Sequence, residues 1–237
     1  MRTLKILSLG IGALLLVPAG PSAGTATDEV ATWELNDPAG SATMRDSSGH
    51  GIHGNVGDEV QTNVRVAGAT AYRWTKVNPN QFPAKPERLV TVDDDDLNPG
   101  SGDYAVTVRF RTTHSAGNLM QKGQAGSRGG YFKLQNVRGK ITCLFRGYDD
   151  GVRQSKAVNS GSIPLNDGAW HVITCERTAD KVEMTIDGER IRRGRGPTGT
   201  ISNQLPLSLG GKYNCDQVKI TCDYWSGDFD YVTIKAG

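Results

Sequence analysis

Apolar and polar residues alternate along much of the chain, and residues 104–112 show the pattern most clearly. Every second side chain from Tyr104 to Phe110 is apolar, and those between them from Thr107 onward are threonine or arginine. Successive side chains of a strand point to opposite faces, so a period of two predicts a strand with one buried and one wet face. Such strands are typical of antiparallel sheets.

A second alternating run, 181–186, predicts a β-hairpin with the residues that follow it. Asp187-Gly188 comes directly after this run, and 189–191 is again strand-like. A two-residue type I′ turn needs positive φ at both central positions, and Asp-Gly meets that need.

Strands are predicted through the rest of the chain, with glycine and proline in the intervals. The other predicted strands are 30–35, 64–67, 71–74, 88–92, 119–122, 131–136, 140–145, 169–177, 205–209 and 229–235. After residue 26, no stretch sustains the apolar spacing of a helix. The predicted fold class is all-β, a two-sheet antiparallel jelly-roll sandwich.

The first 26 residues have the three-part pattern of a secretory signal peptide. Two basic residues precede an apolar run at 6–17, and a small-residue stretch follows. The run is shorter than the roughly 20 residues of a membrane-spanning helix. We expect cleavage after Ala23 or Ala26, so that 1–26 is removed and 27–237 is a single domain, secreted and extracellular.

The charge of the chain is nearly balanced, with 27 Lys+Arg against 25 Asp+Glu. Loss of Arg2 and Lys5 with the signal would leave 25 of each sign. A balanced domain gives no electrostatic footprint for nucleic acid or for an anionic membrane, and we expect no membrane insertion. The one basic cluster, Arg190–Arg195, is predicted to be a solvated hairpin face, with a polyanion patch as the alternative.

Four cysteines follow the signal segment, and an even number in an exported protein favours disulfides. Four cysteines allow three connectivities. Strand context favours Cys143–Cys175, as a bridge between neighbouring strands, and Cys215–Cys222, as the closure of a short loop. A four-cysteine zinc site is disfavoured because the paired CxxC spacing is absent.

Four ordered segments carry a family resemblance. They are Trp33-Glu-Leu-Asn36 with the glycine-rich 46–54, the strand 103–112, Asp167-Gly-Ala-Trp-His-Val-Ile173 with 186–189, and Gly227-Asp-Phe-Asp-Tyr-Val-Thr-Ile234. Together they resemble laminin G-like jelly rolls of the concanavalin A-like lectin/glucanase superfamily, of the secreted bacterial type. The resemblance covers nearly all of 27–237. It implies a fold rather than a ligand, because this fold hosts lectins, adhesion modules and enzymes.

The resemblance also implies a structural calcium ion where the first and last strands meet. Ca²⁺ takes six to eight oxygen ligands, largely from carboxylates and backbone carbonyls. The positions that match are Asp46 in the glycine-rich loop and Asp230, with Asp228 as a substitute. The alternative is that Asp46 caps a turn and Asp230 pairs with a basic neighbour.

Catalysis is not expected. Some glucanases of the superfamily carry E-x-D-x-E or E-x-D-x-x-E on one strand, where two acids act on a glycosidic bond. The nearest match, Glu183 to Glu189 with Asp187 between them, misses the spacing and places Asp187 in a turn. No nucleophile elbow or phosphate loop is present.

A secreted, non-catalytic binding module for a glycan is therefore the favoured function. Sugars stack on aromatic rings and accept hydrogen bonds at their edges. The candidate ligand-binding residues are Trp225, Tyr213, Tyr148, Trp74, Asp149 and Asn214, with Tyr224, Arg146 and Asp150 nearby in sequence. Trp33 and Trp170 are expected in the core. The alternatives are an adhesion module that binds a cell-surface or matrix protein and, less favoured, a glycoside hydrolase.

Overall fold

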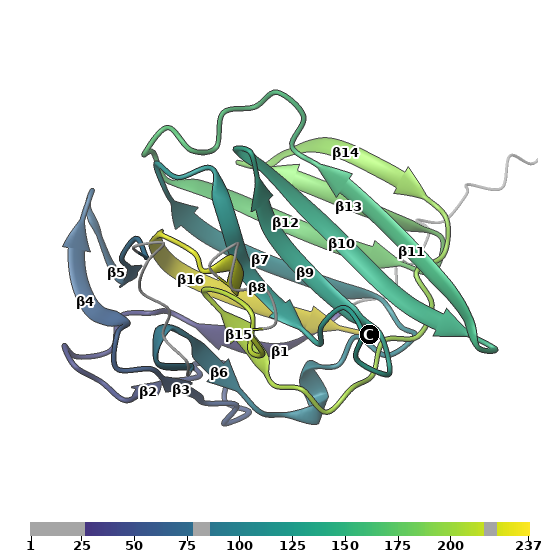
Figure 1. Ribbon diagram of the computed structural model, residues 1–237, viewed down its shortest axis with the longest axis horizontal. Coiled ribbons are helices and arrows are strands. Elements are labelled where there is room, and N and C mark those ends of the chain that lie inside the picture. The colour runs from purple at the N-terminus through teal and green to yellow at the C-terminus, as the bar shows by residue number, and fades with distance from the viewer. Residues whose placement is uncertain (1–26, 78–85, 216–221) are drawn as a thin grey trace, which may run out of the picture.

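The computed structural model describes residues 27–77, 86–215 and 222–237 and shows a sandwich of two antiparallel sheets (Figure 1). The strands are β1 (Asp28–Trp33), β2 (Thr43–Met44), β3 (Gly54–Val56), β4 (Gln61–Val66), β5 (Ala69–Trp74), β6 (Val90–Val92), β7 (Tyr104–Arg111), β8 (Ala116–Lys122), β9 (Tyr131–Val137), β10 (Lys140–Asp149), β11 (Val152–Asn159), β12 (His171–Thr178), β13 (Lys181–Ile186), β14 (Glu189–Arg195), β15 (Leu207–Leu209) and β16 (Gly227–Ala236). Two short 3₁₀ turns, Pro86–Arg88 and Asp95–Leu97, join them.

In the described part of the chain, each sheet has eight strands. The first sheet, sheet A, runs in the order β14-β13-β12-β7-β16-β5-β4, with β1 also pairing with β16. The second, sheet B, runs β11-β10-β9-β8-β15-β6-β3-β2. The predicted all-β, two-sheet fold class is confirmed. The predicted signal peptide lies outside the described residues, and within them no helix is long and apolar enough to cross a membrane.

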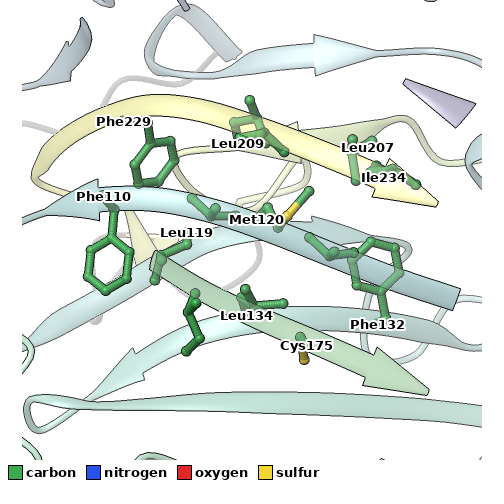
Figure 2. Packing of buried hydrophobic residues seen from close by; sticks show 14 of the residues in the cluster. Phe110, Leu119, Met120, Phe132, Leu134, Cys175, Leu207, Leu209, Phe229 and Ile234 are labelled. Carbon is green, nitrogen blue, oxygen red and sulfur yellow. The ribbon is translucent and has the colours of Figure 1, made fainter. Parts of the chain in front are cut away.

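The core fills the space between the sheets and follows the alternation of β7. Its apolar side chains at 104, 106, 108 and 110 are fully buried, while the residues between them remain partly exposed. Figure 2 shows Phe110, Phe229 and Ile234 of sheet A close to core residues of sheet B such as Leu119, Met120 and Leu209. The burial of opposed apolar faces is the main force that holds the sheets together.

The predicted hairpin at 181–191 is present as β13 and β14. Asp187 and Gly188 have φ of 50° and 85°, as a type I′ turn requires. The second strand continues past 191 to Arg195, so the basic cluster is the outer strand of sheet A. The Asp187 carboxylate also accepts the Val172 backbone N–H at 2.7 Å, which ties the turn to β12.

Two disulfides join the pairs of cysteines that strand context favoured. Cys143 lies on β10 of sheet B and Cys175 on β12 of sheet A, with their Cα atoms 6.0 Å apart. This bond therefore joins opposite sheets, which corrects the expectation of a bridge between neighbouring strands. Cys215–Cys222 closes a short loop, and both bonds suit an oxidising, extracellular location.

Removal of the disulfide between the sheets should cost more stability than removal of the loop disulfide. The residues of each pair are 32 and 7 positions apart. Because loop entropy grows with loop length, Cys143→Ala with Cys175→Ala should lower the free energy of unfolding by about 3–4 kcal/mol, and Cys215→Ala with Cys222→Ala by about 2 kcal/mol. Urea denaturation of the two double variants measures both values, and equal losses would contradict the prediction.

A second prediction concerns His171, whose ring lies between two carboxylates. Its Nδ1 is 2.8 Å from Asp187 and its Nε2 is 3.2 Å from Asp167. Burial lowers the pKa of His171, but hydrogen bonds to these two acids outweigh burial and raise the pKa above its usual value. The cation thus stabilises the fold below the unfolded-state pKa of about 6.5, and this contribution is lost as pH rises through the folded pKa.

We expect the free energy of unfolding to fall by about 0.5 kcal/mol as pH rises above about 6.5, since the partner carboxylates are half exposed. His171→Gln should abolish this loss, and His114→Gln should retain it. Urea denaturation at several pH values measures the effect. An unchanged slope in the His171 variant would show that the contact between the imidazolium and the two carboxylates does not act in solution.

Candidate functional site: a basic pocket at the rim

Two adjoining hollows open at the rim of the sandwich, where β5 and β7 end and β16 begins. They measure about 320 and 310 Å³ and share Lys76, His114 and Ser226. We call them together the rim pocket. Its lining is Arg73, Trp74, Thr75, Lys76, Val77, Arg111, Thr112, Thr113, His114, Ser115, Ala116, Tyr224, Ser226, Gly227 and Asp228.

Strand register builds the floor of the rim pocket. Asp228 of β16 lies directly opposite Arg73 of β5 on one side and Arg111 of β7 on the other. The Asp228 carboxylate is nearly buried and accepts hydrogen bonds from Arg73 Nε at 2.6 Å and Arg73 Nη2 at 3.2 Å. Arg111 Nη1 approaches the same carboxylate at 3.5 Å, and Arg111 Nε donates to the carbonyl of Gly168. The hydrogen bond to Asp228 raises the pKa of Arg73.

Lys76 and His114 form the basic part of the wall. Burial, followed by the nearby charge of Lys76, lowers the pKa of His114, so this imidazole is neutral at pH 7. Thr112 accepts the backbone N–H of His114 through its hydroxyl and donates to the carbonyl of Ser226. In the described part of the chain, no acidic side chain lies within ion-pair distance of Lys76. The wall therefore presents an ammonium group, hydroxyl groups and a neutral imidazole to solvent.

The two tryptophans predicted to bind ligand belong to the core instead. Trp225 is 0% exposed and packs between Phe110 and Phe229, with ring centroids 5.8 and 5.4 Å away. Trp74 is 2% exposed, and its indole N–H donates to the carbonyl of Arg88. Trp74 borders the rim pocket, but neither ring can present a face to a sugar. The two tryptophans were predicted to bind ligand from their positions beside loops, and such positions do not report burial.

The other predicted ligand-binding residues lie on the surface but do not line the rim pocket. Tyr148 is 40% exposed at the end of β10, beside the exposed Asp149, and its backbone pairs with Thr200. Tyr213 is 38% exposed, and the adjacent Asn214 donates its backbone N–H to the side chain of Gln124.

Trp170 also differs from its expected place. Trp33 is fully buried, but Trp170 is only partly buried. The guanidinium of Arg109 lies 4.9 Å from the centre of the Trp170 ring, and the indole N–H donates to the carbonyl of Ala67. Trp170 therefore packs outside the core, against polar groups.

The three acids proposed as calcium ligands have other partners. Asp46 caps its glycine-rich turn and accepts the backbone N–H groups of Thr32, Ser48 and Ile52 at 3.0–3.1 Å; these bonds outweigh burial and lower the pKa of Asp46. Asp230 pairs with Arg109, and Asp228 with the two pocket arginines. Among the described residues, no three acidic, histidine or cysteine side chains form a metal-binding group. This arrangement does not fit a calcium ion.

A melting experiment tests the calcium ion that the resemblance implies. A ligand that binds only the folded state must raise the melting temperature. Because the three carboxylates are already hydrogen-bonded, we expect the same melting temperature in millimolar calcium and in chelator. Differential scanning calorimetry measures both, with magnesium as the control for ionic strength. A rise specific to calcium would show that these acids exchange their partners for the ion.

Comparisons with known proteins agree with this architecture. The family model of the laminin G domain matches residues 110–226. This part of the chain is therefore similar to a laminin G domain. The matched segment contains Arg111 to His114 and ends at Ser226, so it includes much of the rim pocket.

Solved structures with this fold come from several sources. Domains LG4-5 of the mouse laminin α1 chain are similar with a TM-score of 0.51 and 20% identity, over 74% of this chain and 44% of that one. Domain 4 of AbnA, an extracellular arabinanase from Geobacillus stearothermophilus, is similar with a TM-score of 0.57 and 15% identity, over 89% of this chain and 93% of that one. The binding domain of botulinum neurotoxin serotype D is similar with a TM-score of 0.56 and 14% identity, over 88% of this chain and 46% of that one. At these identities the likeness concerns the fold.

A curated relative is the Fat-like cadherin-related tumor suppressor homolog of Drosophila melanogaster, which is 25% identical over 95 residues. The match covers 40% of this chain and 2% of the relative. The chain thus corresponds to a small part of that protein and spans less than half of the mouse laminin structure.

Proposed function

We propose that this chain is an extracellular, non-catalytic binding domain that holds an acidic glycan in the rim pocket. The observation that carries the proposal is the lining of that pocket. Arg73, Lys76 and Arg111 supply charged donors, and the exposed Thr75, Thr113 and Ser115 supply hydroxyls that can both donate and accept. A few convergent polar groups in a concave site are what a sugar needs for oriented hydrogen bonding.

Charge favours a sugar that carries a carboxylate or a sulfate. The pocket holds three permanent cations and one carboxylate, since His114 is neutral at pH 7, and 3 − 1 leaves a local charge of +2. Asp228 already holds Arg73 and Arg111, so the ammonium of Lys76 is the donor best placed to meet an incoming anion. The arabinanase domain with the same fold was solved in complex with arabinotriose, which supports a sugar as the class of ligand.

Hydrolysis finds no support in the same pocket. Glycosidic cleavage by the usual routes requires two carboxyl groups on either side of the bond. The rim pocket has one acid, Asp228, and it is bound to two arginines. Glu183, of the sequence segment nearest to a glucanase motif, is nearly buried and bonded to Lys181 and Arg193. Each acid therefore has a structural partner.

The test is a glycan array followed by titration of the acidic and neutral oligosaccharides that bind. We expect acidic oligosaccharides to bind and Lys76→Glu to weaken their affinity by about tenfold, because the change reverses the charge that meets the anion. Lys235→Glu on the exposed end of β16 makes the same charge change away from the pocket and should bind like the unaltered protein. Equal affinity of the Lys76 variant, or an array without a ligand, would contradict the proposal.

A further inference from the structure

The last strands of the two sheets lie side by side. β11 ends sheet B and β14 ends sheet A, and residues of these two strands are in contact (Figure 1). The two strands are in direct contact, because a Cβ atom added at Gly194 of β14 would lie 3.0 Å from the Lys156 side chain on β11. We call this pair of strands the basic edge, and it shares no residue with the rim pocket.

The basic edge concentrates positive charge in a chain that is otherwise balanced. β14 carries Arg190, Arg192, Arg193 and Arg195 against one acid, Glu189, and β11 carries Arg153 and Lys156 with no acid. The sum over the two strands is 4 + 2 − 1 = +5. Glu183 of β13 neutralises part of it by pairing with Arg190 and Arg193.

The remaining charges have no acidic partner among the described residues. No ion pair among these residues includes Arg153, Lys156, Arg192 or Arg195. Arg153, Arg192 and Arg195 are exposed, and Lys156 is half-buried against Gly194 and Gly196 of the neighbouring segment. This end of the sandwich is therefore set up to attract an anionic partner.

β11 also offers a free backbone edge. It pairs with β10 through eight consecutive residues without a register shift, and no strand pairs with its other side in the described part of the chain. Eight residues of strand extend about 27 Å. The strand contains no proline, and Val152 at its start is 60% exposed. Its outward N–H and C=O groups can accept a further strand.

Charge decides which strand can be added. Two copies of this chain would bring like charges together at β11, and such charges are a usual protection against edge-to-edge association. An extended segment rich in Asp and Glu would instead pair its backbone with β11 and place its carboxylates near Arg153, Lys156 and the β14 arginines. We propose that the basic edge binds an acidic, extended peptide segment of another protein by strand addition to β11.

A sulfated glycan could pair with the basic side chains but could not form backbone hydrogen bonds with the free edge of β11. The experiment therefore separates glycan binding from strand addition. The probe is a fluorescent octapeptide that repeats Glu-Glu-Thr-Thr, so that carboxylates lie on both faces of the added strand, as Arg153 and Lys156 do on β11. Its binding is measured by anisotropy. A matched peptide is N-methylated at alternate residues, which retains every charge and removes backbone donors. We expect the first peptide to bind and the N-methylated one to bind about tenfold more weakly. Equal affinity for the two peptides would overturn strand addition.

Variants locate the site. Arg153→Glu with Lys156→Glu should weaken peptide binding by about tenfold or more, because two attractive charges become repulsive. Arg65→Glu on β4, the outer strand at the far end of sheet A, is the control and should retain full affinity. Equal binding by the double variant, with the fold verified by circular dichroism, would contradict the proposal. So would a sulfated oligosaccharide that displaces the peptide while the N-methylated peptide binds as well as the first.

The proposal does not depend on the rim pocket. Lys76→Glu should leave peptide affinity unchanged, and Arg153→Glu with Lys156→Glu should leave glycan affinity unchanged. Each of the two proposals can therefore fail while the other holds, and the crossed measurements show which one has failed. Loss of peptide binding in the Lys76 variant would contradict the placement of the peptide at the basic edge.

Discussion

Burial of two apolar faces against each other is the constraint from which the rest of the structure follows. Each strand must send every second side chain inward, so the intervening side chains have to face outward. On β7 this places Val108 and Phe110 in the core and Arg109 and Arg111 outside it. The position of Arg111 beside Asp228 is thus a consequence of core packing, and the rim pocket depends on the same register that fills the interior.

Local patterns were sufficient for the parts of the fold that alternate strongly. The strand from Tyr104, the Asp187-Gly188 turn and the two-layer architecture could all be predicted from neighbouring residues. β11 could not, because its inward-facing positions include Gln154 and Lys156, so the strand has no apolar period to detect. The rim pocket was missed for a different reason. Arg73 and Asp228 are 155 positions apart and meet only through strand pairing, which local periodicity does not report. Burial of Trp225 likewise depends on distant neighbours.

The acids and the bases of this chain have different surroundings. Several carboxylates are engaged internally: Asp46 caps a turn, Asp187 ties a hairpin to β12, and Asp228 and Glu183 hold arginines. Basic side chains such as Lys76 and Arg195 face solvent instead. A chain with almost equal numbers of both charges can therefore show a basic surface. Net charge gave no hint of a charged ligand, because it counts groups without regard to their position.

The pairing of β1 with β16 has a mechanical consequence. Asp28 lies opposite Ala236, so the chain enters and leaves the sandwich at adjacent points. A force that pulls these two points apart would open the hydrogen bonds between β1 and β16 one after another, as in unzipping. It would not shear them all at once. The Cys143–Cys175 bond would still hold the opposite sheets together after that ladder had opened, which makes the middle of the domain the part most resistant to tension.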